Sequence, residues 1–149
     1  MALVFLALGS NLGNSKQNII DAIQNINLEL GQIIGQSSIM ESEPWGFESK
    51  NIFANAVISI QTSLDPYSLL HATQNIEKEM GRTEKSESGY ADRIIDIDIL
   101  LYDQQIIHQP TLYIPHPHIT KRTFVYAPLL EIAPNIQLPG HDKMLKESV

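Results

Sequence analysis

Residues 93–102 read Arg-Ile-Ile-Asp-Ile-Asp-Ile-Leu-Leu-Tyr, which places two acids inside one of the most apolar runs of the chain. On a strand, successive side chains alternate between the two faces, so Asp96 and Asp98 point the same way and lie about 6.6 Å apart. The opposite face is apolar and gives the strand a reason to be buried; it holds Ile95, Ile97, Ile99 and Leu101. The run therefore predicts a buried strand with an acidic face.

The acidic face of this strand is a candidate metal site. Two carboxylates on one partly buried face repel each other and lose hydration, so they need a cation or strong hydrogen-bond donors. A solvated strand face that carries Asp96 and Asp98 by chance is the alternative, because Asp-x-Asp is a short and common string. The strand alone leaves both interpretations open.

The composition indicates a single globular domain, 1–149, that is large enough for a core of its own. The formal net charge is -7 and no long basic run occurs, which argues against a nucleic-acid partner. Cysteine is absent, which excludes disulfides, thiolate metal sites and cysteine nucleophiles. The apolar start, 1–8, is too short for a signal peptide or a membrane span. We expect a soluble, cytoplasmic protein without a membrane partner.

Hydrophobic periodicity and turn residues divide the chain into strands and helices. Strands are predicted at 2–8, 32–41, 53–62 and 93–102, helices at 15–30 and 65–80, and then a short hairpin at 104–107 and 112–114 and a short helix at 119–126. The order β-α-β-β-α-β plus a C-terminal appendage predicts an α+β, ferredoxin-like antiparallel sheet with helices on one face. We expect the first and last of the four main strands side by side at its centre.

Other motifs each allow a structural and a functional interpretation. The glycine-rich turn at 9–14 could let backbone approach a ligand, but it is not a Walker loop, and such turns more often only connect a strand to a helix. Asn55 is an amide among apolar strand residues, where a bond to neighbouring backbone would satisfy it. Trp45 could mark a binding loop or cover a core edge. His116 and His118 could bind zinc, but the sequence offers no third ligand.

Short motifs follow one another along nearly the whole chain. They are Leu8-Gly9-Ser10-Asn11-Leu12-Gly13, Glu43-Pro44-Trp45-Gly46, Phe53-Ala54-Asn55-Ala56, Gly81-Arg82, residues 93–100, Pro115-His116-Pro117, Arg122-Thr123-Phe124 and residues 128–134. Any one of them is weak, but in this order and spacing they resemble the motifs of one family, the 6-hydroxymethyl-7,8-dihydropterin pyrophosphokinases of folate biosynthesis.

The resemblance implies transfer of pyrophosphate from ATP to the hydroxymethyl group of the pterin, with release of AMP, on a ferredoxin-like fold. It implies that Asp96 and Asp98 bind two magnesium ions that bridge the ATP phosphates. Mg²⁺ suits such a site because it prefers oxygen ligands and is completed by water and substrate phosphates. Arg82 and Arg93 match arginines that the family places near the phosphates, so the implied catalytic set is Arg82, Arg93, Asp96 and Asp98.

The resemblance also assigns residues to the two substrates. The pterin is expected between Phe53 and Phe124, ring on ring, with Asn55 bonded to its polar edge in place of neighbouring backbone. The implied pterin site is completed, mainly through backbone groups, by Ser42, Pro44 and Trp45. The implied nucleotide-binding residues are Gln74, Glu77, Arg82, Arg93, Ile99, His116 and Arg122.

Two functions of other classes remain to be weighed. A ferredoxin-like binding or regulatory module could keep a pterin or nucleotide pocket without catalysis, but it would not need the intact set Asp96, Asp98, Arg82 and Arg93. A magnesium-dependent nucleotide hydrolase would leave Phe53, Asn55 and Phe124 unexplained. The expected partners are therefore ATP and the hydroxymethyl-dihydropterin, and we expect a monomer.

Overall fold

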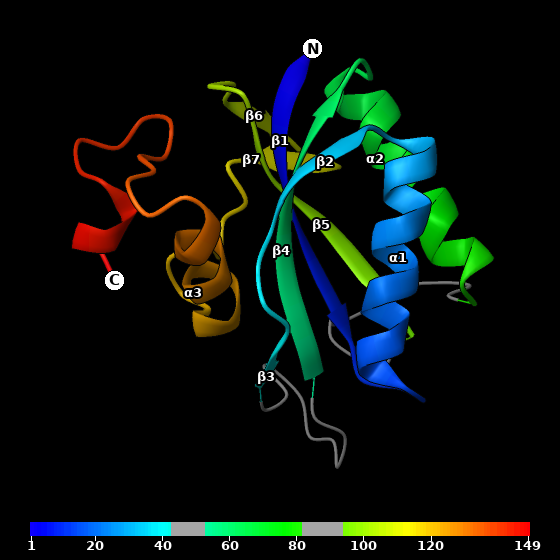
Figure 1. Ribbon diagram of the computed structural model, residues 1–149. Helices are drawn as coiled ribbons and strands as arrows, with labels where there is room; N and C mark the ends of the chain where they lie inside the picture. The colour runs from blue at the N-terminus through cyan, green and yellow to red at the C-terminus, as the bar shows by residue number, and fades with distance from the viewer. Residues whose placement is uncertain (43–52, 82–93) are drawn as a thin grey trace.

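The computed structural model describes residues 1–42, 53–81 and 94–149 (Figure 1). The elements, in chain order, are β1 (Ala2–Ser10), α1 (Ser15–Glu29), β2 (Gln32–Gln36), β3 (Met40–Ser42), β4 (Phe53–Thr62), α2 (Pro66–Glu79), β5 (Asp96–Tyr102), β6 (Ile107–Gln109), β7 (Leu112–Ile114), α3 (Thr123–Ile132) and the 3₁₀ turn η1 (Leu145–Glu147). None of the helices in these ranges is long and apolar enough to cross a membrane.

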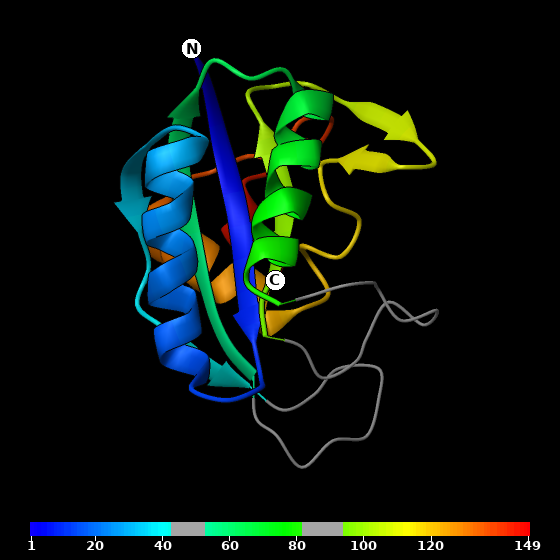
Figure 2. The same cartoon turned by 90° about the vertical axis from the view of Figure 1, so that its right-hand side faces the viewer.

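The main sheet is antiparallel and has the strand order β2-β4-β1-β5, with β3 paired to β4. α1 leads the chain from β1 to β2, and α2 leads it from β4 across β1 to β5, as Figure 2 shows. The first and last of the predicted main strands are therefore side by side. The expected central place of the last strand is wrong, because the crossover by α2 sets β5 at the end of the described sheet.

Helices cover both faces of this sheet (Figure 1). α1 and α2 pack on one face, over a core cluster that includes Leu6 and Ile58. α3 packs on the other face, over a smaller cluster that includes Val57 and Leu129. The expectation of helices on one face holds for α1 and α2 only, because α3 covers the second face. The third helix also differs in its bounds: it runs from 123 to 132 rather than from 119 to 126.

A β-bulge in β5 corrects one predicted side-chain direction. Phe5 of β1 pairs with Leu101, but the next residue, Leu6, pairs with Ile99, so Leu100 has no counterpart. One extra residue reverses the alternation of faces beyond it. Leu101 therefore lies in the cluster under α3, with Phe5, and not on the isoleucine face where the unbroken alternation placed it.

The predicted strand at 32–41 is interrupted between β2 and β3, because the hydroxyl of Ser37, and not a backbone carbonyl, accepts the next N–H of β4. The N–H of Ser37 donates to the Val57 carbonyl at 2.9 Å, and Ser37 Oγ accepts the Val57 N–H at 2.9 Å. The N–H and hydroxyl of Ser38 donate to the two carboxylate oxygens of Glu131 on α3, at 2.8 and 2.9 Å. The break between β2 and β3 is thereby anchored to both β4 and α3.

α2 begins at the acid and proline that the sequence indicated. Asp65 is its N-cap and accepts the N–H groups of Tyr67 and Ser68 at 3.0 and 2.9 Å, with Pro66 in the first turn. These bonds, the one from the Ser68 backbone foremost, lower the pKa of the Asp65 carboxyl from 3.8. The cap therefore stabilises the fold fully above pH 3.8, and the contribution is lost as the pH falls through the lowered pKa.

α2 is capped by Met80 and followed by Gly81, whose φ of +110° is a conformation that other residues rarely adopt. A Cβ at this position would lie 2.8 Å from Ile94 Cδ1, just ahead of β5. The end of α2 and the start of the acidic strand are therefore in contact.

We expect Gly81→Ala to lower the free energy of unfolding by about 2–3 kcal/mol, because it adds backbone strain and crowds Ile94. Gly13→Ala is the matched control, since Gly13 also has a positive φ, +64°, but nothing lies within 4 Å of the added Cβ. That variant should lose only about 1 kcal/mol, the cost of an alanine in the left-handed region. Urea unfolding of both proteins measures the difference, and equal losses would show that contact with Ile94 contributes nothing.

Candidate active site

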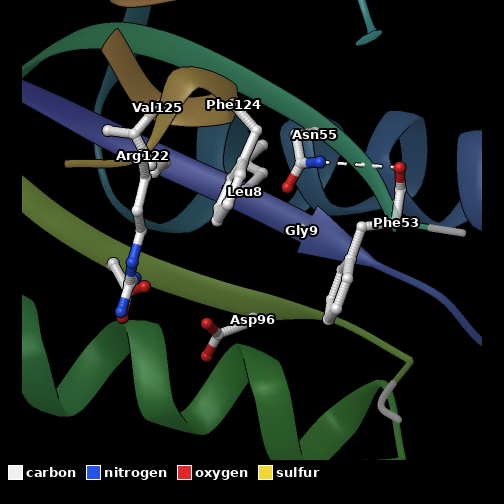
Figure 3. Close-up of a pocket in the computed structure, with 10 residues that line it drawn as sticks. Leu8, Gly9, Phe53, Asn55, Asp96, Arg122, Phe124 and Val125 are labelled. Atoms are coloured by element: carbon white, nitrogen blue, oxygen red, sulfur yellow. Dashed lines mark hydrogen bonds between the residues drawn. The ribbon is translucent and has the colours of Figure 1, made fainter. Parts of the chain in front are cut away.

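A cavity opens on the α3 side of the sheet, where one end of β1, β4 and β5 meets the start of α3 (Figure 3). Its wall combines aromatic, amide, acidic and cationic side chains. The lining residues are Ala7, Leu8, Gly9, Phe53, Asn55, Asp96, Asp98, Arg122, Phe124 and Val125.

The strand register explains why the cavity forms here. Gly9 of β1 pairs with Asn55 of β4 on one side and with Asp96 of β5 on the other. The side chains of Asn55 and Asp96 thus flank a position that has no side chain. A Cβ on Gly9 would lie 3.3 Å from Asn55 Oδ1 and 3.7 Å from Phe53 Cδ1, so the glycine provides open space at the floor of the cavity.

The two acids of β5 lie on the cavity side of the strand, as their spacing predicts. Asp96 and Asp98 are half-buried, and Ile97 between them is buried in the core under α1 and α2. Asp98 pairs with Ala7, and Asp96 pairs with Gly9, so small residues of β1 stand beside both carboxylates. Within the described ranges no group of three His, Cys, Asp or Glu side chains forms a metal site, so these ranges offer the two acids no third protein ligand of this kind.

Arg122 supplies the positive charge of the cavity wall. It is the N-cap residue of α3, is only 6% exposed, and its side chain runs from α3 towards β5 (Figure 3). Its guanidinium carbon lies 5.9 Å from the centre of the Phe124 ring, which is cation–π range. Burial lowers the pKa of Arg122 to about 10, so the side chain stays cationic at neutral pH. One buried cation and two carboxylates thus share one wall.

The opposite part of the wall suits a flat, polar-edged molecule. Asn55 is 4% exposed and lies between the half-buried rings of Phe124 and Phe53 in the close-up (Figure 3). Its Nδ2 donates to the Phe53 carbonyl at 3.5 Å, a long and therefore weak bond. Aromatic faces favour stacking with a planar ring, and an amide can donate and accept at once.

The structure brings some of the predicted site residues together and leaves others elsewhere. The cavity contains Phe53, Asn55, Asp96, Asp98, Arg122 and Phe124. Four predicted nucleotide-binding residues do not line it: Gln74, Glu77, Ile99 and His116. Pro44, Trp45, Arg82 and Arg93 lie outside the described residues, as does the side chain of Ser42, whose backbone pairs with Phe53.

The four residues outside the cavity have other surroundings. Glu77 on α2 is buried and accepts the N–H of Ile97 at 2.8 Å, and Gln74 is half-buried on the same helix. Ile99 is 4% exposed in the core under α1 and α2. His116 follows β7, where its N–H donates to the Leu100 carbonyl at 2.9 Å. Their assignment to the nucleotide stays a prediction.

Sequence reasoning assigned neither Ala7, Leu8 nor Val125 to a site, and it considered Gly9 only as part of a turn that could approach a ligand. The available signal was the alternation of small residues on one face of β1, Ala7 and Gly9, which leaves room on that face. These small residues predict a cavity only when β1 is known to lie between β4, which carries Asn55, and β5, which carries Asp96.

Solved structures share this fold. The crystal structure of wild-type Plasmodium falciparum HPPK-DHPS matches 97% of the chain with a TM-score of 0.75 and 16% sequence identity. The chain spans 43% of that protein's length. At this identity the likeness concerns the fold.

Sequence relatives identify the family. A Porphyromonas gingivalis protein named 2-amino-4-hydroxy-6-hydroxymethyldihydropteridine pyrophosphokinase is 46% identical to this chain, and the match covers 90% of this chain and 92% of that protein. An Aquifex aeolicus protein of the same name is 45% identical, and the match covers 99% of this chain and 90% of that protein. The family model of 7,8-dihydro-6-hydroxymethylpterin-pyrophosphokinase matches residues 5–134. The chain therefore belongs to the 7,8-dihydro-6-hydroxymethylpterin-pyrophosphokinase family, as the resemblance of its motifs implied.

Proposed function

We propose that the cavity between β1, β4, β5 and α3 transfers pyrophosphate from ATP to the hydroxymethyl group of 6-hydroxymethyl-7,8-dihydropterin. Membership in the family makes the chain a transferase of folate biosynthesis with these two substrates. The observation that carries the residue-level proposal is that one cavity holds both a planar-ring site and an acid–arginine wall.

The pterin occupies the part of the cavity between Phe53 and Phe124. Its bicyclic ring stacks on these side chains, and its amide-like edge bonds to the amide of Asn55. This places the hydroxymethyl group towards β5, on the side of Asp96. We also assign pterin contacts, mainly through backbone groups, to Ser42, Pro44 and Trp45.

The acids of β5, Asp96 and Asp98, would hold magnesium at the boundary between the two substrates. The fit rests on two oxygen donors on one strand face, with small residues beside them and no third acidic or histidine ligand in the described part of the chain. Mg²⁺ accepts such a partial ligand set because water and phosphate oxygens complete it. When bound to Asp96 and Asp98, two such ions would neutralise phosphate charge and orient the triphosphate.

The reaction is an in-line displacement at the β-phosphorus of ATP. The pterin hydroxyl oxygen bonds to that phosphorus, the bond from it to the oxygen of the α-phosphate breaks, AMP leaves, and the hydroxyl proton is released. Phosphoryl transfer needs mainly positioning and charge stabilisation from the protein. Arg122 contributes a fixed buried cation, and we assign the same task to Arg82 and Arg93. We further assign Gln74, Ile99 and His116 to the nucleotide, whereas the buried Glu77 lies behind β5 and does not line the cavity.

The sheet supports a ferredoxin-like assignment for residues 1–149 as one pyrophosphokinase domain. Its order β2-β4-β1-β5, with α1 and α2 as the two crossovers on one face, is what two interleaved β-α-β units produce. The β6–β7 hairpin, α3 and η1 then form the C-terminal appendage, of which α3 closes the cavity.

A product assay tests the function. The protein is incubated with ATP, Mg²⁺ and the hydroxymethyl-dihydropterin, and the nucleotide product is identified. We expect AMP, formed only when the pterin is present. A binding module would form no AMP, while a nucleotide hydrolase would release product without the pterin; either result, or formation of ADP, would refute the proposal.

We expect Gly9→Ala to raise the KM for the pterin about tenfold and to leave the KM for ATP within about twofold, because the new methyl group enters the ring site beside Asn55. Gly35→Ala is the matched control: its Cβ would lie 2.5 Å from Ser59 Oγ, so it is crowded too, but it does not line the cavity. Steady-state kinetics and thermal unfolding are measured for both variants. Equal effects on the pterin KM would mean that the loss reflects general destabilisation.

A further inference from the structure

Glu77 binds the acidic strand from the side opposite the cavity. It lies in α2, which packs against β5, and it is only 3% exposed. Its Oε2 accepts the N–H of Ile97 at 2.8 Å, a bond that is itself buried. Ile97 separates Asp96 from Asp98, so this carboxylate is bonded to the backbone between the two acids.

The position of β5 in the sheet explains why this bond matters. β5 pairs with β1 on one side and ends the strand order of the described sheet. In an antiparallel strand, alternate N–H groups point away from the partner strand. Ile97 pairs with Leu8, and its N–H points outward, to Glu77. A buried N–H needs a hydrogen-bond acceptor. Here the carboxylate of Glu77 takes the place of the backbone carbonyl that a further strand would provide inside a sheet.

A second contact shows that α2 holds the same end of β5. Gly81, directly after α2, lies against Ile94, which precedes Ile95, a fully buried core residue. The helix thus meets the strand at Ile94 and again at Ile97. Asp96 and Asp98 therefore lie on a segment whose outer edge contacts α2 and the turn after it.

We infer that Glu77 is a positioning residue: by accepting the Ile97 N–H, it fixes the backbone between Asp96 and Asp98 so that both carboxylates face the phosphate side of the cavity. The inference rests on the proposed function of the two acids. It differs from direct nucleotide contact, because Glu77 would act through the strand and does not line the cavity. Partners of this kind around a metal site typically change metal affinity 10- to 100-fold when lost.

Two substitutions separate hydrogen-bond reach from charge. Glu77→Gln keeps the length of the side chain and an acceptor oxygen but removes the charge. Glu77→Asp keeps the charge but is shorter by one methylene, so it no longer reaches Ile97. Each change alters the side chain by a single group. The control pair is Glu79→Gln and Glu79→Asp, at an exposed acid of the same helix.

Two measurements report on the strand and on the acids without relying on turnover. Amide hydrogen exchange of Ile97 follows the bond directly. Binding of Mn²⁺, as a spectroscopic probe for Mg²⁺, is measured by electron paramagnetic resonance with the non-hydrolysable analogue α,β-methylene-ATP present. We expect Glu77→Asp to speed Ile97 exchange at least about tenfold and to weaken Mn²⁺ binding about tenfold. Glu77→Gln should stay within about threefold of the unaltered protein, and both Glu79 variants should match it.

The outcomes distinguish this inference from the proposed function. If Glu77→Asp left Ile97 exchange or Mn²⁺ affinity unchanged, or if Glu77→Gln lost as much as Glu77→Asp, the positioning role would be wrong. If the unaltered protein formed no pterin-dependent AMP, the proposed function would fail, while the exchange and Mn²⁺ results would still decide the role of Glu77.

Discussion

Asp98→Ala is expected to reduce pyrophosphate transfer by about a thousandfold or more while it leaves pterin affinity within about threefold. The carboxylate faces the cavity from β5 and, among the residues that the structure describes, is one of two acids that line it. Its loss removes half of the proposed metal ligands and leaves a wall in which Arg122 neutralises Asp96, so the site attracts a cation less strongly. The ring site is built from β4 and α3, so it does not depend on this side chain.

Transfer is measured as pterin-dependent AMP formation, and pterin affinity by fluorescence titration. Asp98→Asn is the informative companion, because it keeps the shape and one oxygen but removes the charge; it should lose nearly as much activity as Asp98→Ala. Asp142→Asn, at an exposed acid outside the cavity, should retain full activity. Near-normal turnover of Asp98→Ala would mean that the metal site has been assigned to the wrong residues.

The features of the fold that could be predicted are those set by local sequence. The i, i+2 spacing of Asp96 and Asp98 put them on one face, and Asp65-Pro66 marked the start of α2, because alternation and capping depend on neighbouring residues only. The direction of Leu101 was wrong because it depends on a bulge against Phe5, which is distant in the chain. Local periodicity carries no information about such a register shift.

The candidate site could be predicted only in part for the same reason. The resemblance of motifs named Phe53, Asn55 and Phe124, and the cavity brings them together. Gly9 was considered only as part of a turn that could approach a ligand, because its contribution is the space between two partner strands, which a single sequence does not reveal. The bond from the Ile97 N–H to Glu77 was equally hidden, since it depends on how α2 packs along β5.

Asn55→Asp is expected to weaken pterin binding about a hundredfold and to leave the KM for ATP nearly unchanged. The two side chains have almost the same shape, so the fold and the space between the rings are preserved. The substitution removes the NH₂ donor, which turns a matched pterin edge into an unpaired one, a loss of about 1–3 kcal/mol. It also places a new carboxylate in a site that is 4% exposed and shares a wall with Asp96, where like charges repel.

Isothermal titration with the pterin and steady-state kinetics with ATP separate the two substrates. The control is Asn135→Asp, the same chemical change at an exposed asparagine whose Oδ1 accepts from Lys146 Nζ at 3.0 Å. Because repulsion from Asp96 adds to the loss of the donor, the pterin affinity of Asn55→Asp should partly recover at lower pH, as the new carboxyl becomes protonated and can donate. A pH-independent affinity close to that of the unaltered protein would show that Asn55 does not bind the pterin edge. An equally large increase in the KM for ATP would show that the two substrates do not occupy the separate parts of the cavity proposed for them.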